Sequence, residues 1–536
     1  MVSRLRSRLH NMEMPLNSAW RKGLVFGAGA ALCLIYVLLA GRLFVASLYG
    51  EISVGEIPRL ASLQRAAHLD PSNADYRDVL GDYYAQAGDL AAAIGHYTAA
   101  VKLNPHSARY WLDLANAYLV LGDRYTSNQT EALERAIEAD PTRPDVAWEA
   151  ANFYLVEGSD EKALREFRVV LQNDPFKAGD AIRLCWHIKP DVDELLRDTV
   201  PARPEADLAF LSLLMIPKKV DLSMSTAPLN PSGKRWVYTL AEVDPRAGSN
   251  AWANASVSLS GYTGGATGNN VTATIAASTP TTIEIENPTG TSTNTGTPVL
   301  MISRVVSDSS LAATGGTNRE TEATAKVWAA LMASRQPFEQ RSVYGYIQYL
   351  IDHRDVEQAR SVWEQAAPRF GLSAYLPTQR NLIVNGSFSL DVLNGGFDWR
   401  YEKLPSVTLT LDPSDFHSGT RSLLIAFDGP GISDAGIHQF IAVRPSTTYD
   451  FSAYYKSGDF EGAGGPHIII QDAVSRAVLY DSDELKERGY WKLVSREFTT
   501  PDDCRLLDLR VLRVPEGSPI RGKLWVDDFR LVAKRQ

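Results

Sequence analysis

Four prolines recur at a nearly constant interval in the first half of the chain and constrain its fold more than any other feature. They are Pro71, Pro105, Pro141 and Pro175, so the intervals are 34, 36 and 34 residues. The apolar residues between them follow a helical spacing, and proline ends a helix because it lacks an amide proton and crowds the preceding turn. A period of this length predicts a solenoid of helical hairpins, each of which buries its apolar stripe only by stacking on its neighbours.

The residues between the prolines also follow a consensus. Small residues stand where paired helices must approach closely, and aromatic residues fill the gaps between layers. The consensus positions are Leu80, Gly81, Tyr84, Ala93, Tyr97, Ala100, Trp111, Leu114, Ala115, Tyr118, Leu133, Ala136, Ala150, Ala151, Tyr154, Ala163 and Phe167. This pattern resembles the tetratricopeptide repeat (TPR), which implies an all-α solenoid over residues 58–218 with a groove for a protein partner. We expect its aromatic side chains to belong to the core rather than to a ligand site.

The helical pattern loosens after the last of these prolines, is lost over residues 219–320, and resumes over residues 321–370. Only two residues between 251 and 300 are charged, and twelve of the forty residues from 261 to 300 are Thr. Two interpretations of this Thr/Gly/Asn-rich insert remain open: a small β-sandwich in a turn of the array, or a flexible loop. Alternating runs such as Thr282-Ile-Glu-Ile-Glu favour β structure.

The amino-terminal segment predicts a membrane helix. Residues 23–40 carry no charge, and a helix of eighteen residues spans about 27 Å, close to the roughly 30 Å hydrocarbon core of a bilayer. Arg42 lies near one end of the apolar run, where its long side chain can reach the interface, so we expect a transmembrane helix over residues 23–45. The basic tail, residues 1–22, is expected in the cytoplasm, and the rest of the chain beyond the membrane. A cleaved signal peptide is the alternative, which the length of this tail disfavours.

Composition limits the chemistry that the chain can perform. Lys and Arg number 54 against 63 Asp and Glu, a formal charge of −9, which disfavours a nucleic-acid partner. Three cysteines, Cys33, Cys185 and Cys504, are too few for a disulfide framework or a four-thiolate metal site. The sequence has no phosphate-binding loop of P-loop form, no His-Glu-x-x-His motif and no Gly-x-Ser-x-Gly motif. We therefore expect a protein that is not an enzyme and that needs no cofactor.

The carboxy-terminal region, residues 380–534, reads as short β-strands throughout, beginning with the segments 381–388 and 395–399. Strands of this number predict a two-sheet, all-β jelly roll. The motifs are Asn381-x-x-x-Asn-Gly-x-Phe, Gly396-Phe-x-Trp, Ser418-Gly-x-x-Ser-Leu, Gln439-x-x-x-Val-x-Pro-x-x-x-Tyr, Trp491 and Trp525-Val-Asp-Asp. This ordered set is similar to carbohydrate-binding modules of families 4 and 9, which implies a domain that binds a glycan without catalysis. Together with an anchored TPR array, it resembles proteins found near bacterial O-antigen and exopolysaccharide assembly systems.

Seven residues of this domain are candidates for carbohydrate contact, because sugar rings pack on aromatic faces and their hydroxyls need planar polar partners. Trp399 and Tyr401 are two residues apart, so on a strand they share a face. The neighbours Tyr454 and Tyr455 point to opposite faces, so we expect one in the core and one accessible. The polar candidates are His438, Gln439 and Gln471.

The same resemblance raises the question of a structural calcium ion. Modules of this type often carry an acidic residue after the Asn-Gly-x-Phe motif, but here that position is Ser389, which removes an anionic ligand. Asp527 and Asp528 remain the metal candidates, and capping of the last strand is their alternative role. Trp491 and Trp525 resemble packing positions.

These expectations combine into a multidomain protein of the bacterial cell envelope. A single helix would anchor it in the inner membrane with the bulk of the chain in the periplasm. The repeats would bind a protein partner and the jelly roll a polysaccharide, as a scaffold. The alternative is an assembly factor that makes only protein–protein contacts and whose jelly roll has no glycan ligand.

Overall fold

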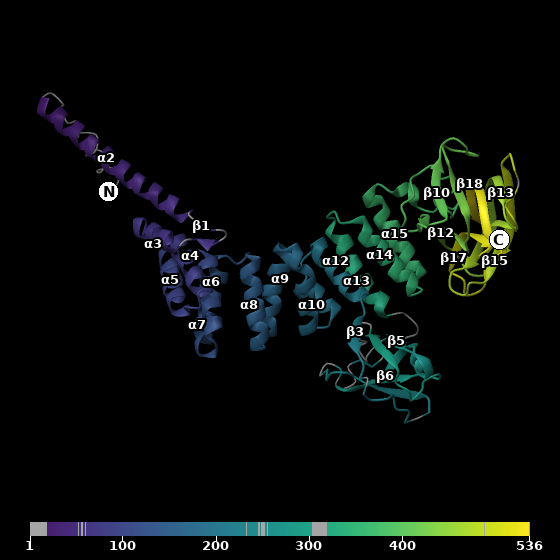
Figure 1. The fold of residues 1–536 in the computed structure, drawn as a ribbon, viewed down its shortest axis with the longest axis horizontal. Helices are drawn as coiled ribbons and strands as arrows, with labels where there is room; N and C mark the ends of the chain where they lie inside the picture. Colours follow the sequence, from purple (N-terminus) through teal and green to yellow (C-terminus); the bar gives the residue numbers. More distant parts are fainter. Residues whose placement is uncertain are drawn as a thin grey trace, which may run out of the picture. The chain divides into compact units, whose positions relative to one another are not determined.

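A computed structural model describes residues 19–534 apart from residues 52, 55–56, 59, 224, 232, 245–246, 248–251, 254–255, 303–318 and 487. Most of the predicted basic tail therefore lies outside the described residues. The chain divides into two compact units, residues 1–189 and 190–536, and each is described by itself (Figure 1).

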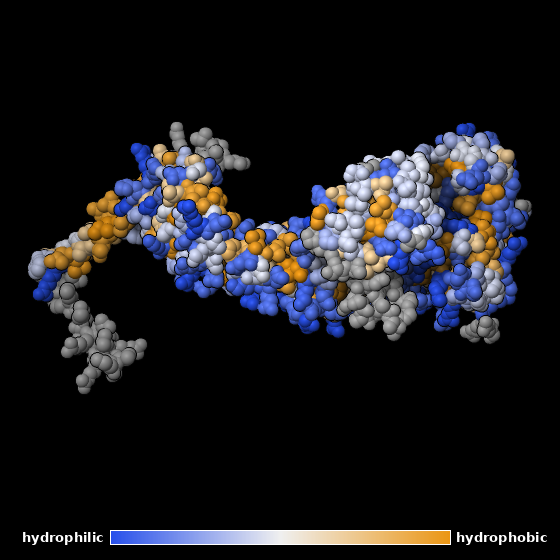
Figure 2. Space-filling model, turned by 90° about the horizontal axis from the view of Figure 1, so that it is seen from below, coloured by the Kyte–Doolittle hydropathy of each residue, from blue (hydrophilic) through white to orange (hydrophobic). Residues whose placement is uncertain are grey.

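The first unit opens with α2 (Ala19–Gly50), a 32-residue helix that is long and apolar enough to cross a membrane. Figure 2 shows hydrophobic residues along its exposed surface. Arg42, which interrupts the apolar run, donates from Nε to the carbonyl oxygen of Leu69 at 2.6 Å, at the end of α3 (Leu60–Leu69). This arginine therefore finds its partner in the protein, because it caps a carbonyl that the end of α3 leaves unpaired.

Three antiparallel helical hairpins follow and stack on one another (Figure 1). Their helices are α4 (Ala74–Gln86), α5 (Leu90–Leu103), α6 (Ala108–Leu121), α7 (Thr126–Ala139), α8 (Pro144–Glu157) and α9 (Asp160–Asn173). Pro105, Pro141 and Pro175 each stand two residues beyond the end of a second helix, as the sequence predicts. A Cβ atom on Gly81 would lie 2.5 Å from the ring of Tyr97, so only glycine permits this close approach of α4 and α5. The unit ends with α10 (Ala178–Ile188).

The second unit contains the resumed helices, the insert and the jelly roll. Its helices are α11 (Val192–Asp198), α12 (Pro204–Met215), α13 (Arg319–Ser334), α14 (Gln340–Asp352) and α15 (Val356–Ala366). Lys326 of α13 bonds to Asp193 of α11 at 2.7 Å, so helices from the two sides of the insert pair with each other. Trp328 and Trp363 are buried among these helices.

The insert is a single six-stranded antiparallel sheet in the order β3-β8-β5-β6-β7-β4. Its strands are β3 (Lys218–Asp221), β4 (Arg235–Thr239), β5 (Ser256–Tyr262), β6 (Val271–Ser278), β7 (Thr282–Glu286) and β8 (Gly296–Ile302). Ile283 and Ile285 alternate into its buried core with Trp236 and Tyr238. The prediction of β structure is confirmed, although the strands form one sheet and not a sandwich of two.

The jelly roll consists of two five-stranded antiparallel sheets that enclose one apolar core. The β9 sheet has the order β15-β14-β17-β12-β9, and the β10 sheet has the order β10-β11-β18-β13-β16. The strands are β9 (Arg400–Tyr401), β10 (Val407–Asp412), β11 (Ser422–Gly431), β12 (Asp434–Ala442), β13 (Thr448–Glu461), β14 (Gly465–Asp472), β15 (Val478–Asp481), β16 (Lys492–Thr499), β17 (Leu506–Val514) and β18 (Pro519–Ala533). The predicted all-β fold is confirmed.

The segments 381–388 and 395–399 were expected to be strands, and this prediction is wrong because they form turns. The Asn381 side chain donates to the Phe529 carbonyl and accepts from the amides of Ile383 and Leu531, so it occupies backbone groups that a strand would pair. A Cβ on Gly386 would lie 2.2 Å from the Phe529 oxygen. The Asn-Gly-x-Phe motif therefore bonds the start of the domain to its last strand, β18.

Candidate functional site

The outer face of the β9 sheet carries a set of polar side chains that the strand periodicity places there. Along β17, Leu507 and Leu509 point into the apolar core, so Asp508 and Arg510 point outwards. The same alternation places His438 of β12 on this outer face, next to β17. One sheet surface thus collects charged groups contributed by several strands.

Asp508 lies at the centre of this surface and is completely buried by its partners. It accepts hydrogen bonds from His438 Nδ1 at 3.0 Å, Gln471 Nε2 at 3.2 Å, Arg476 Nη1 at 2.9 Å and Arg510 Nη1 at 3.1 Å. Burial alone would raise the pKa of Asp508, but the hydrogen bond from His438 and the charge of Arg510 outweigh it, so the pKa lies below its ordinary value. The carboxylate therefore fixes four donor side chains, of which Arg476 is the most exposed, at 59% of its side chain.

Aromatic rings border this polar centre. Phe440 contacts His438 edge to face, with ring centroids 4.9 Å apart, and the guanidinium of Arg400 lies 5.0 Å from the centre of the Phe440 ring. Tyr401, on the edge strand β9, is 39% exposed but pairs with the core residue Ile437, so it points to the other face of the sheet. On the other side of Asp508, Arg510 Nε donates to Asp434 at 2.8 Å. The face thus combines fixed hydrogen-bonding groups with aromatic surface.

The structure brings together two of the predicted site residues, His438 and Gln471, on the outer face of the β9 sheet, where both bond to Asp508. Gln439 points the other way and is buried, with its side-chain amide bonded to both backbone groups of Val384. Trp399 packs in the core, and its Nε1 donates to the Asn385 carbonyl at 3.2 Å. Tyr401 pairs with the core residue Ile437, so it points to the core side of the sheet, as Trp399 does, but at the exposed edge.

The remaining candidates lie in the β10 sheet. Tyr455 is buried in the core, whereas Tyr454 points outwards and stacks on His417 with ring centroids 3.6 Å apart, so their predicted opposite orientation is confirmed. Trp491 contacts the same histidine edge to face, and Trp525 Nε1 donates to Asp412 at 2.8 Å. Neither tryptophan belongs to the apolar core, but both are half-buried and pack on neighbours, Trp491 on His417 and Trp525 on Gly458.

Sequence reasoning missed the centre of the site, Asp508, and its partners Arg476 and Arg510. A signal was available in the run Leu506-Leu-Asp-Leu-Arg-Val, where Asp508 and Arg510 alternate with the apolar residues of the strand. Alternation of this kind indicates a strand with one face in the core and one polar face.

The two calcium candidates bind a turn instead. Asp527 accepts from the backbone amides of His417 at 2.8 Å and Ser418 at 3.1 Å, and burial raises the pKa of Asp527 to about 6. Asp528 bonds to the side chains of the same two residues, each at 2.6 Å. Among the described residues, no three His, Cys, Asp or Glu side chains are grouped so as to hold a metal ion. Both carboxylates are thus engaged with the turn that contains His417 and Ser418.

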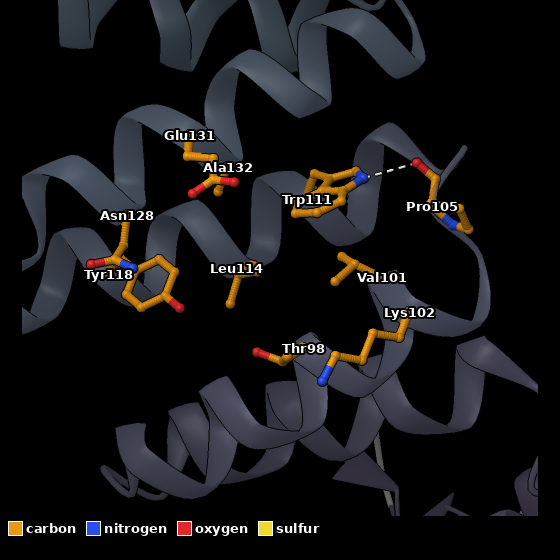
Figure 3. Close-up of a pocket in the computed structure, with 10 residues that line it drawn as sticks. All are labelled: Thr98, Val101, Lys102, Pro105, Trp111, Leu114, Tyr118, Asn128, Glu131 and Ala132. Atoms are coloured by element: carbon orange, nitrogen blue, oxygen red, sulfur yellow. Dashed lines mark hydrogen bonds between the residues drawn. The ribbon is translucent and has the colours of Figure 1, made fainter.

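The repeats contain a hollow of about 380 Å³ between α5, α6 and α7 (Figure 3). Trp111 and Tyr118 line it and are half-buried, and Trp111 Nε1 donates to the Pro105 carbonyl at 2.9 Å. Tyr97 and Phe167 are buried, as expected of core residues. Trp111 and Tyr118 are partly buried and pack against the same repeat core while they also line the hollow.

Comparison with known proteins supports the assignment of the repeats. A tetratricopeptide repeat family model matches residues 60–105 and 79–125. A comparison with curated proteins found no match.

Solved structures resemble single parts of the chain. One is a CBM4 structure with 17% identity and a TM-score of 0.23, matched over 28% of this chain and 99% of that chain. Another is the CBM22-1 xylan-binding domain of Paenibacillus barcinonensis Xyn10C, with 14% identity and a TM-score of 0.21, over 28% and 93%. A third is MamA, with 24% identity and a TM-score of 0.22, over 28% and 82%.

Proposed function

We propose that this protein is a non-catalytic, membrane-anchored scaffold that binds a polysaccharide on the outer face of the β9 sheet and a protein partner on its repeats. The single observation that carries the first part is the hydrogen-bonded network around Asp508 on that face. A buried carboxylate that fixes four donors at a sheet surface provides preorganised groups, and preorganisation lowers the entropic cost of binding.

The chemistry of this face suits a carbohydrate. Arg476 and Arg510 present planar donors to hydroxyl oxygens, and the carboxylate of Asp434 accepts from hydroxyl groups. The half-buried ring of Phe440, beside His438 on this face, offers apolar surface on which the C–H face of a sugar ring can pack. A ligand site combines in this way a few fixed polar groups with apolar surface.

The repeats support a protein-binding role. Stacked helical hairpins bind extended or helical segments of partner proteins. The hollow lined by Trp111 and Tyr118 offers such a segment an apolar anchor point (Figure 3). A partner in the same envelope or exopolysaccharide assembly system would be brought next to the polysaccharide.

The location that we propose is the bacterial inner membrane, with the repeats and the jelly roll in the periplasm. The length and apolar surface of α2 support a membrane span. Arg21 and Lys22 lie at its amino end, and positive charge at that end favours a cytoplasmic amino terminus.

Replacement of Arg476 by Ala tests glycan binding. Detergent-solubilised full-length chain is run in native gels that contain xylan, mannan, dextran, alginate or hyaluronan. We expect at least one polysaccharide to retard the wild type. We expect R476A to bind it about ten-fold more weakly, since a hydrogen bond from a charged group is lost.

The matched control is Arg360→Ala, which removes an exposed arginine of α15 that pairs with Glu357 and Glu364. This variant should migrate like the wild type. If none of the polysaccharides retards the wild type, glycan binding is refuted and the protein–protein assembly factor remains.

A further inference from the structure

The helical hairpin of α14 and α15 packs directly against the jelly roll beside the β9 sheet. A Cβ on Gly395 would lie 2.3 Å from the ring of Tyr344 in α14, and a Cβ on Gly396 would lie 3.2 Å from the ring of Trp363 in α15. Trp363 is fully buried, and its Nε1 donates to the Tyr375 carbonyl at 2.9 Å. The backbone just before β9 therefore rests on two aromatic rings of the helices, without room for side chains.

A series of side-chain contacts, hydrogen bonds at α14 and ring contacts at Phe440, connects α14 with the candidate site. Arg400 of β9 bonds through Nη1 to the side-chain oxygen of Gln348, and through Nη2 to the Gly396 carbonyl at 2.9 Å. Gln348 Nε2 in turn donates to Asp352 at 2.7 Å. The same Arg400 guanidinium lies over Phe440, which contacts His438, a partner of Asp508. The network around Asp508 thus continues from the sheet onto the helix.

The spacing along α14 shows which of its residues face this surface. Tyr344, Gln348 and Asp352 are four residues apart and therefore lie on one side of the helix. Tyr344 contacts Gly395, and Gln348 contacts Arg400. Asp352 is the next residue along this side of the helix. Asp352 is exposed and is the last residue of α14, where a negative charge is unfavourable for the helix dipole. The bond from Gln348, four residues earlier, offsets this cost and holds Asp352 in place at the exposed end of α14.

We propose that α14 forms one wall of the polysaccharide-binding face, with Gln348 and Asp352 contacting the sugar that lies over Arg400. This inference rests on the proposed glycan binding by the β9 sheet. It makes the site composite: the jelly roll supplies the floor, and the helical hairpin supplies residues that help select the sugar.

The charges of this composite surface indicate the class of glycan. Its guanidiniums, Arg400, Arg476 and Arg510, are accompanied by the carboxylates Asp352, Asp434 and Asp508. The face thus has no surplus of positive charge to attract uronic acids, and the exposed carboxylate of Asp352 repels them. The ligand that fits is a neutral polysaccharide, whose hydroxyls donate to Asp352 and accept from the Gln348 amide.

The test compares Gln348→Ala and Asp352→Asn with the wild type in the native gels described above, again with full-length protein. We expect each variant to bind the retarding neutral polysaccharide about five-fold more weakly, as for the loss of one hydrogen bond. Asp352→Asn should also let alginate or hyaluronan bind more tightly than to the wild type. The control is Glu364→Gln, an exposed acid of the same hairpin that pairs with Arg360.

The outcomes separate this inference from the proposed function. If R476A loses binding while Q348A and D352N bind like the wild type, the helical wall is refuted and glycan binding by the sheet stands. Preference of the wild type for acidic polysaccharides refutes the assignment to neutral glycans. Absence of any binding by the wild type refutes both proposals. Thermal unfolding of each variant shows that it is folded, and D352N is expected to unfold at or above the wild-type temperature.

Discussion

Two buried carboxylates of the jelly roll show how partners decide the state of an acid. Asp508 is surrounded by arginine, histidine and amide donors, and its pKa lies below the ordinary value although it is buried. Asp398 is equally buried but accepts a hydrogen bond only from backbone donors, among them the Leu393 amide at 2.8 Å, and burial raises its pKa to about 7. Asp508 is therefore ionised and contributes a negative charge to the site, whereas Asp398 is protonated in mildly acidic solution.

Replacement of Asp398 by Asn should therefore stabilise the protein in a pH-dependent way. An unfolded Asp titrates near about 3.9, so between that pH and about 7 the folded chain binds a proton that the unfolded chain does not. The free energy of unfolding of the wild type thus falls as the pH rises through this window, because the buried carboxyl must lose its proton. The side-chain amide of D398N does not titrate, so the variant avoids this loss of stability. We expect the melting temperature of D398N relative to wild type to be higher at pH 8 than at pH 4. An equal difference at both pH values would contradict the assignment.

Individual site residues were only partly predictable from the sequence. Alternation along a strand correctly separated Tyr454 from Tyr455, because neighbouring side chains must point to opposite faces. The same rule could not be applied at Trp399, because the segment before β9 is a turn and not a strand. Asp508 stood in the sequence as one acid among 63, and only the pairing of β17 with β12 and β14 brings its partners to it.

At the scale of elements, the helical hairpins were the most predictable part. Proline ends a helix through local chemistry, so its period fixes the helix ends without knowledge of the fold. The close packing of α4 on α5 was likewise signalled by Gly81, whose missing side chain leaves room for Tyr97.

A substitution at Gly81 tests this packing. Gly81→Ala should lower the free energy of unfolding by about 1–3 kcal/mol, since the added methyl group overlaps the Tyr97 ring. The matched control is Gly95→Ala in the middle of α5, where nothing lies within 4 Å of the added Cβ. The control should gain up to about 1 kcal/mol from the better helix former. Denaturant unfolding followed by circular dichroism measures both, and equal effects would contradict the packing model.

Other elements could not be predicted because they depend on distant partners. The turns over 381–399 follow from side-chain bonds to β18, which lies more than a hundred residues later. The arrangement of the insert as one sheet depends on the pairing of β3 with β8, two strands at opposite ends of the inserted segment. A sequence pattern identifies strands but does not state their order.

At the scale of the whole molecule, the chain joins an apolar helix, a helical repeat array and a jelly roll. The apolar helix α2 continues into the repeats, where Arg42 caps α3. A helical hairpin of the second unit packs against the jelly roll through Tyr344 and Trp363. The jelly roll is therefore integrated with the helices that precede it, which gives the proposed composite site a fixed geometry.

Hydrogen–deuterium exchange of the full-length chain, with and without the retarding polysaccharide, tests the central claim most directly. The account predicts slower exchange on binding in β12, β14 and β17 and in α14, and no change in β10 or β16. Protection confined to the outer strands of the β10 sheet, or to the repeats, would contradict it.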